Sequence, residues 1–302
     1  MIHWTYLITF YLFSAGVSAG AMMVSIAADF INPVKYGKIV RAGAYIAPFP
    51  IMAGMVVLIF DLERPLLFWL LLTTFKYKSI MSVGAWIITF FSATSIIYFI
   101  LNLRKDYLKL KPGTSRAIKI MGLILSTCVA LYTGLLLSTL TARPLWNTQA
   151  LPVLLFISSV IDGLAAIALL LCLRPDCFSQ SPQTDETINN NNTFIHTGDF
   201  VLLFSLLICT LVFLIGMGSS TGSAASALSI ITSGKFSVLF WVGFVAAGIV
   251  IPLIAASYEL CTKVTTHRPW LNFIAASLAL TGGYIVRGII VNAGQLSRAI
   301  LF

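Results

Sequence analysis

The sequence predicts an all-α integral membrane protein, and three observations carry that prediction. Of the 302 residues, 59% are hydrophobic and only 10% are charged, and the mean hydropathy is +0.96. An ordinary soluble domain carries charge on about a quarter of its residues. The apolar residues also fall into runs long enough to span a membrane, because about 20 helical residues cross a hydrocarbon core. We therefore set nucleic-acid binding aside and ascribe the net charge of +9 to topology and contact with membrane lipid.

Eight apolar runs, separated by turn and charge signals, predict eight transmembrane helices. They cover residues 5–28, 43–62, 80–103, 117–141, 150–173, 198–218, 235–259 and 270–293. No basic segment precedes the first run, so we expect it to remain as a span and not to be cleaved as a signal peptide. Within it, Gly16 and Gly20 have the GxxxG spacing of closely packed helices. The Gly-, Ser- and Ala-rich stretch 216–227 fits a helix end, a re-entrant piece or a packed loop.

The basic residues predict the orientation of the chain. The loops after the first, third, fifth and seventh helices hold twelve Lys and Arg, whereas the opposite loops hold six. Because cytoplasmic loops carry the excess of positive charge, we expect both termini on the outer face, which is the periplasm in a bacterial inner membrane. The nineteenth cation, Arg287, falls inside the last helix, where snorkelling toward the surface is the simpler interpretation.

The chain divides at its middle. Residues 1–178 hold the first five helices, residues 179–197 form a polar cytoplasmic linker, and residues 198–302 hold the last three helices. The linker contains SQSPQTDETINNNNT, a composition typical of a flexible solvated segment. No loop is long enough to bury a core of its own, so we expect catalysis on any soluble substrate to belong to a partner subunit.

Three acidic residues are candidates for a proton path in the cytoplasmic half. Asp162 lies near the middle of the fifth span, where an ionised carboxylate is costly, so a proton relay and a structural hydrogen bond are both open. Asp199 opens the sixth predicted span and is equally interpreted as a helix cap. Glu259 closes the seventh, where an acid opposes the helix dipole.

A second polar group gathers in the outer half of the membrane. Asp61, Glu63 and Arg64 follow the second span, and their alternative interpretation is an interfacial ion-pair cluster. Single members of the group are ordinary interface residues, but together they predict a polar recess walled by aliphatic side chains, which suits an amphipathic ring with a long apolar tail. The other members of this group are His3, Trp4, Tyr11, Tyr132, Thr133, Arg143, Trp146, Arg287, Asn292 and Gln295.

Histidine and cysteine argue against a cofactor held by this chain. A membrane cytochrome b needs pairs of axial His inside its helices, but His3, His196 and His267 all fall at or beyond the predicted span ends. The five Cys include no CxxC pair. We expect neither haem, nor an iron–sulfur cluster, nor another metal in this subunit.

Several motifs together resemble the NrfD/PsrC family, the quinone-binding membrane subunits of polysulfide, nitrite, tetrathionate and related respiratory reductases. The likeness spans almost the whole chain, and the order and spacing of the motifs are more specific than any one of them. They are SAGVSAG (14–20), DLERPLLFWLL (61–71), SIMSVGAW (79–86), YTG (132–134), RPLWNT followed by LP (143–152) and GGYIVRGIIVNAGQ (282–295).

The resemblance implies eight helices in two four-helix bundles and a menaquinol or ubiquinol site near the periplasmic face. It also implies a periplasmic ferredoxin-like partner with four iron–sulfur clusters, which passes electrons to a molybdenum enzyme or a multihaem cytochrome c. Tyr132 matches the tyrosine that contacts the quinone head in the polysulfide-reductase type. The Asn and His that this type has in its first helix fall at Leu7 and Tyr11 here, so Tyr11 and His3 substitute for them or the head group is held differently.

We therefore expect a membrane anchor subunit that oxidises quinol, with Tyr132 on one ring oxygen and Asp61 or Glu63, tuned by Arg64, accepting protons. Two other interpretations stay open. One is a secondary transporter or proton-translocating module, although the two halves show no evident inverted repeat. The other is a bare membrane anchor, for which a quinone analogue would leave the intrinsic fluorescence of the subunit unchanged.

Overall fold

The computed structural model describes residues 6–61, 73, 79–103, 112–139, 143–174, 185–219, 222–262 and 269–297. These residues form the helices α1 (Tyr6–Ile31), α2 (Gly37–Ile46), α3 (Pro48–Asp61), α5 (Ile80–Leu103), α6 (Pro112–Ser138), α7 (Ala150–Leu173), α8 (Asp185–Gly218), α9 (Gly222–Thr232), η3 (Leu239–Val250), α10 (Ile251–Thr262) and α11 (Pro269–Leu296).

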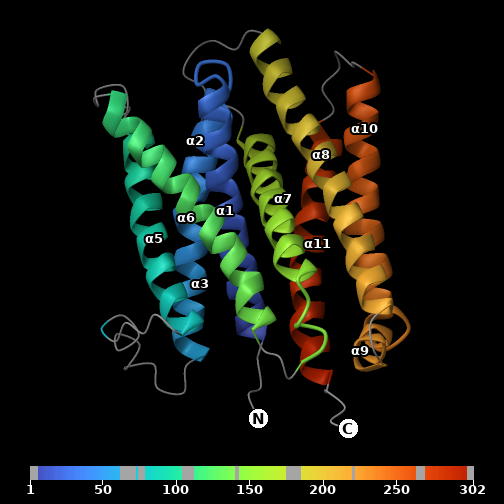
Figure 1. Ribbon diagram of the computed structural model, residues 1–302. Helices are drawn as coiled ribbons and strands as arrows, with labels where there is room; N and C mark the ends of the chain where they lie inside the picture. Colours follow the sequence, from blue (N-terminus) through green and yellow to red (C-terminus); the bar gives the residue numbers. More distant parts are fainter. Residues whose placement is uncertain are drawn as a thin grey trace.

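Eight spans in the described part of the chain are long and apolar enough to cross a membrane, which confirms the predicted fold class. They run roughly parallel to one another, and α1 begins at the same end of the molecule where α11 ends (Figure 1). We call this the terminal end, and the other the opposite end. The grouping into two four-helix bundles remains a prediction.

Helix α1 lies at the centre of the packing and contacts α2, α3, α6, α7 and α11. Small residues let the neighbouring backbones approach closely. A Cβ atom on Gly20 would overlap the carbonyl of Ser159 on α7, and one on Gly163 would overlap the backbone of Gly20. The GxxxG pattern of the first span therefore packs α1 against α7, as predicted.

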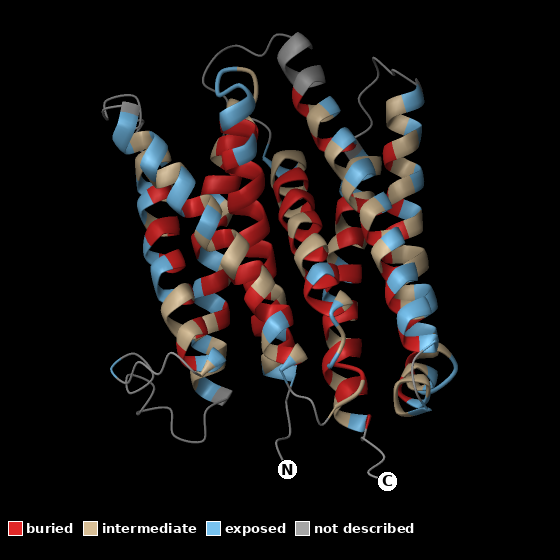
Figure 2. Ribbon diagram, viewed as in Figure 1, coloured by how far each residue is buried: buried red, intermediate tan, exposed pale blue. Residues whose placement is uncertain are grey.

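Buried residues concentrate on α1 and α7, whereas the outer faces of the peripheral helices are exposed (Figure 2). Many of the exposed side chains are large and apolar, among them Phe60, Val238 and Ile254. In a membrane these faces contact lipid, and exposing an apolar side chain to lipid carries no free-energy penalty.

The second span differs from the prediction because it is two helices. α2 begins at Gly37, six residues before the expected start, and α3 follows after Ala47. Pro48 cannot donate a backbone hydrogen bond, so it breaks the helical ladder at this point. The side chain of Ser18 on α1 donates to the carbonyl of Ala47, and Ser25 donates to the carbonyl of Val40 at 2.7 Å, so α1 satisfies backbone acceptors of this segment.

The expected linker is partly helical. Helix α8 begins at Asp185, so residues 185–197 belong to it and not to a flexible segment. Polar composition indicates solvation but does not stop a helix, because adding a residue to a formed helix is far easier than starting one. Residues 179–184 lie outside the described part of the chain. In the small-residue stretch 216–227, α8 ends at Gly218 and the short helix α9 begins at Gly222.

Candidate functional site

Tyr132 and Tyr11 lie close together at the terminal end of the molecule. Tyr132 is six residues from the end of α6, and Tyr11 is five residues from the start of α1. Their side chains are 8% and 3% exposed, and they are close enough to interact electrostatically. Within the described residues, neither hydroxyl makes a hydrogen bond. Two phenol groups thus lie close together without a hydrogen bond to a described residue.

Glycine makes room for Tyr132. A Cβ atom on Gly84 of α5 would overlap the Tyr132 ring and its hydroxyl oxygen, so only glycine permits this approach. On the other side, Gly54 of α3 lies beside the Tyr11 ring, and a Cβ atom added there would lie 3.4 Å from Tyr11 Cδ2. Four helices, α1, α3, α5 and α6, therefore meet at the two rings, and Gly84 belongs to the SIMSVGAW motif.

Thr133 and Arg143 make structural contacts near this site. Thr133 is fully buried, and its hydroxyl donates to the carbonyl of Ala130 at 2.8 Å. One guanidinium nitrogen of Arg143 donates to the carbonyls of Gln295 and Ser297, where α11 ends. These carbonyls lack helical partners, so Arg143 caps the last turn of α11.

Trp146 makes a comparable contact with the same helix. Its indole N–H donates to the carbonyl of Ile290 at 2.8 Å, and its side chain is 3% exposed, so it is a buried tie and not an interface anchor. The segment that contains both residues therefore fastens the loop between α6 and α7 to α11.

Other predicted members of the outer group lie outside the described residues. They are His3, Trp4, Glu63 and Arg64. Asp61 is the last residue of α3, and its side chain is likewise outside the description. Their roles remain predictions.

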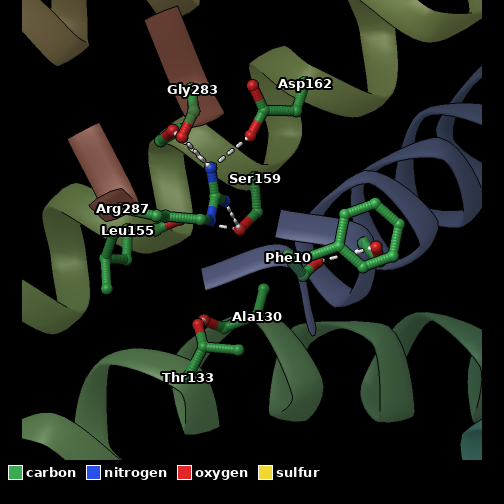
Figure 3. A network of polar contacts seen from close by, with 10 residues as sticks. Phe10, Ala130, Thr133, Leu155, Ser159, Asp162, Gly283 and Arg287 are labelled. Carbon is green, nitrogen blue, oxygen red and sulfur yellow. Dashed lines mark hydrogen bonds and ion pairs between the residues drawn. The ribbon is translucent and has the colours of Figure 1, made fainter. Parts of the chain in front are cut away.

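The clearest polar contact in the described part of the chain joins Asp162 to Arg287. The distance from Arg287 Nη1 to Asp162 Oδ2 is 2.6 Å, and both side chains are almost completely buried. Arg287 also donates to the carbonyl of Gly283 at 2.8 Å and to the hydroxyl of Ser159 at 2.9 Å (Figure 3). The interpretation of Arg287 as a snorkelling side chain was therefore wrong. A counter-charge on α7 removes the need to reach the surface.

One oxygen of this carboxylate is left over. Asp162 Oδ1 is buried and has no hydrogen-bond partner within the described residues. It lies against the backbone of α11, where a Cβ atom on Gly283 would overlap it. Asp162 thus combines a structural ion pair with an unused acceptor, so the pair by itself does not exclude a role in proton transfer.

The placement of Asp199 at the start of its helix was wrong, whereas Glu259 lies in the last turn of α10, at the helix end where the sequence analysis placed it. Asp199 falls well inside α8 and is not an N-terminal cap, because the helix starts at Asp185. Glu259 precedes the end of α10 and lies 3.9 Å from His196, measured from Oε2 to Nε2. His196 itself lies inside a span of residues 191–218, which corrects its placement at a span end. The misleading signal was the polar stretch before residue 198, whose composition is typical of a loop.

Asp199 and His196 line a cavity of about 250 Å³ between α7, α8, α10 and α11. The cavity lies toward the opposite end of the molecule, away from Tyr132. Its remaining lining residues are Ala168, Leu171, Cys172, Asn192, Ile195, Pro252, Ala255, Ala256, Asn272 and Ala275. In the described part of the chain, no three His, Cys, Asp or Glu side chains are placed to hold a metal ion.

Comparison with known proteins gives a consistent result along the chain. A family model described as polysulphide reductase, NrfD matches residues 1–299. The chain is 31% identical to a polysulfide reductase chain of Wolinella succinogenes, over 97% of this chain and 94% of that protein. It is 28% identical to the NrfD homolog of Haemophilus influenzae, over 98% and 95% of the two chains. It is 22% identical to a selenate reductase subunit of Mesobacillus selenatarsenatis, over 95% and 73%.

Proposed function

The chain belongs to the polysulphide reductase NrfD family of membrane subunits of reductase complexes, and on this premise we propose that it binds and oxidises a quinol at its terminal end. The observation that carries the proposal is the pair of buried phenols, Tyr11 and Tyr132, held side by side without hydrogen-bond partners within the described residues. A quinol head has two ring oxygens that need such partners, and its isoprenoid tail suits the lipid-facing helices around the site.

The substrate of this proposal is menaquinol or ubiquinol. Its oxidation releases two electrons and two protons, and the electrons leave to a partner subunit. In this chain Tyr132 donates a hydrogen bond to one ring oxygen, and Gly84 holds the ring of Tyr132 in place by leaving it room. Tyr11 and His3 are the candidates for the second oxygen. Asp61 or Glu63, beside Arg64, takes up the released protons on the terminal face.

The proposed partner is a periplasmic ferredoxin-like subunit with four iron–sulfur clusters, which docks on the terminal end and supplies a molybdenum enzyme or multihaem cytochrome c. Relatives named as parts of polysulfide and selenate reductases support a reductase partner. The excess of Lys and Arg in the loops at the opposite end supports a bacterial inner membrane with both termini in the periplasm.

The experiment replaces the hydroxyl that the proposal uses. In the assembled complex, Tyr132→Phe is expected to lower quinol-dependent turnover by about a hundredfold while leaving assembly intact. Tyr258→Phe, at an exposed position on α10, is the matched control and should leave turnover unchanged. Binding of a quinone analogue can be measured by the quenching of the intrinsic fluorescence. The affinity for the analogue should fall in Tyr132→Phe and stay unchanged in Tyr258→Phe. Normal turnover in Tyr132→Phe would remove this residue from the site.

A secondary transporter is the competing function. It predicts flux of a solute into proteoliposomes that contain this chain alone, whereas a quinol-oxidising subunit needs its partner for any turnover.

A further inference from the structure

The outward face of α2 carries two cations and an aromatic ring. On the side that packs on α1 and α7, α2 buries Ile39, Val40, Ala42, Gly43 and Ala44. Lys38, Arg41 and Tyr45 follow at intervals of three and four residues, so they share the face that points away from this core. α2 begins at Gly37, at the opposite end of the molecule (Figure 1), so the two cations lie nearer the aqueous phase than Tyr45.

The partly buried Arg41 makes no hydrogen bond or ion pair within the described residues. Its guanidinium turns back toward the start of the helix, since a Cβ atom on Gly37 would lie 3.6 Å from Arg41 Nη2. Asp29, the acid near the end of α1, is paired with Lys119 on α6 at 2.5 Å. An anion that approaches the first turn of α2 therefore meets the positive charges of Lys38 and Arg41 at one level of the helix.

Three aromatic rings continue this surface toward the middle of the membrane. The ring centroid of Tyr45 lies 5.5 Å from that of Phe49 on α3 and 5.3 Å from that of Phe99 on α5. The centroids of Phe49 and Phe99 are 5.6 Å apart. We call these three rings the aromatic cluster. Because Tyr45 is 43% exposed and Phe49 is 50% exposed, the cluster presents an apolar surface to lipid where the broken second span meets α5.

Each of these features alone is ordinary at a membrane surface, where cations collect on the cytoplasmic side and aromatic rings anchor a helix. Their combination on one face is more specific. Lys and Arg bind phosphate groups, whereas large apolar side chains pack against acyl chains. Arg41 and Phe49 are separated by about 12 Å along the span, since each helical residue rises about 1.5 Å. The charges therefore lie at the depth of the lipid headgroups and the rings at the depth of the acyl chains.

We propose that the outward face of α2 and the aromatic cluster bind one anionic phospholipid of the leaflet at the opposite end. Its phosphate contacts Lys38 and Arg41, and one acyl chain lies along the cluster, so the lipid bridges α2, α3 and α5. A zwitterionic lipid fits less well, because its ammonium group is repelled by the two cations. A free phosphate ion leaves the rings unused. The site is independent of the proposed quinol site, which lies at the other end of the molecule.

Recognition of the headgroup is tested with the full chain in detergent by native mass spectrometry, with dioleoylphosphatidylglycerol as the probe. In the double variant Lys38→Gln with Arg41→Gln, the affinity for this lipid is expected to fall about thirtyfold, because each cation contributes about fivefold. Arg116→Gln with Arg174→Gln removes the same charge from exposed positions at the same end of the molecule and should leave the affinity unchanged. An equal fall in both double variants would mean that general surface charge attracts the lipid, and it would overturn the site.

Packing of the acyl chain is tested in the same assay with Phe49→Ala. The affinity for dioleoylphosphatidylglycerol should fall about fivefold, since shape-matched contacts and not the exclusion of water hold a chain in lipid. Phe60→Ala, at an exposed position of α3 near the terminal end, is the matched control and should bind the lipid normally. Unchanged affinity in Phe49→Ala, or equally tight binding of glycerol 3-phosphate to the parent chain, would reject a site that holds headgroup and chain together.

Thermal unfolding of the parent chain in detergent gives a test that needs no variant to fold. Dioleoylphosphatidylglycerol should raise the Tm more than dioleoylphosphatidylethanolamine does, because a ligand that binds the folded state stabilises it. Sodium chloride at about 1 M shortens the Debye length to about 3 Å, so it should remove the difference between the two lipids. The same Tm with both lipids at low salt, or a difference that persists at high salt, would contradict the two cations as the basis of selection.

Discussion

Asp162 on α7 and Arg287 on α11 form a buried ion pair with a nitrogen–oxygen distance of 2.6 Å, although 125 residues separate them in the chain. The carbonyl of Gly283 and the hydroxyl of Ser159 accept further hydrogen bonds from the guanidinium. The pair therefore joins α11 to α7, at a level between the proposed quinol site and the cavity. This makes it the first target for mutation.

Removing one partner of the Asp162–Arg287 pair should lower the stability of the protein more than removing both. Asp162→Ala leaves Arg287 charged in the membrane interior, so we expect a loss of about 3–5 kcal/mol of stability. The double variant Asp162→Leu with Arg287→Met removes both charges and should recover most of that loss. Thermal unfolding in detergent measures each variant. A double variant less stable than both singles would show that the pair stabilises through more than charge compensation.

A weaker pair elsewhere gives the comparison. Lys119 on α6 lies 2.5 Å from Asp29 on α1, but their side chains are 16% and 7% exposed. Asp29 lies two residues from the end of α1, so this pair is nearer the end of the molecule than the Asp162–Arg287 pair, and Lys119→Met should cost less stability than Asp162→Ala. High salt should reduce the difference from the parent protein in the same unfolding assay. A loss as large as that of Asp162→Ala would contradict this ranking.

Gly84→Ala should displace Tyr132 without touching its hydroxyl group. The added methyl would overlap the ring, so the ring must move, and quinol-dependent turnover should fall about as far as in Tyr132→Phe. Gly113→Ala on α6 is the control, since nothing lies within 4 Å of its Cβ position and its turnover should stay normal. Full activity of Gly84→Ala would mean that the position of the ring does not matter.

Arg143→Gln should loosen the end of α11. It removes charged donors to the carbonyls of Gln295 and Ser297, which costs about 2 kcal/mol. Amide hydrogen exchange in the last turn of α11 should rise, while the start of the helix stays protected. Arg116→Gln, at an exposed position on α6, is the control and should change neither the stability nor the amide exchange of α11. If Arg143→Gln weakens quinone-analogue binding without raising exchange, Arg143 is a binding residue and not a cap.

Apolar run lengths and charge counts were sufficient to predict the eight spans, because the thickness of the hydrocarbon core sets the length of every span. The motifs were sufficient to point to the family that the comparisons then identified. The ends of the helices were harder to predict from the sequence, and α8 shows the reason. A polar stretch is typical of a linker by composition alone, but a helix continues out of the membrane at little cost.

The partners of the polar residues were decided by the tertiary structure alone. In a membrane the lipid-facing and protein-facing sides of a helix are both apolar, so periodicity does not reveal which side a residue occupies. Arg287 therefore looked like a snorkelling cation, and Asp162 looked like a lone acid. Likewise, Asp199 and His196 line a cavity only because α8 packs on α7, α10 and α11. Composition determined that this protein spans the membrane, whereas helix packing determined where its charges meet, because that depends on contacts between distant segments.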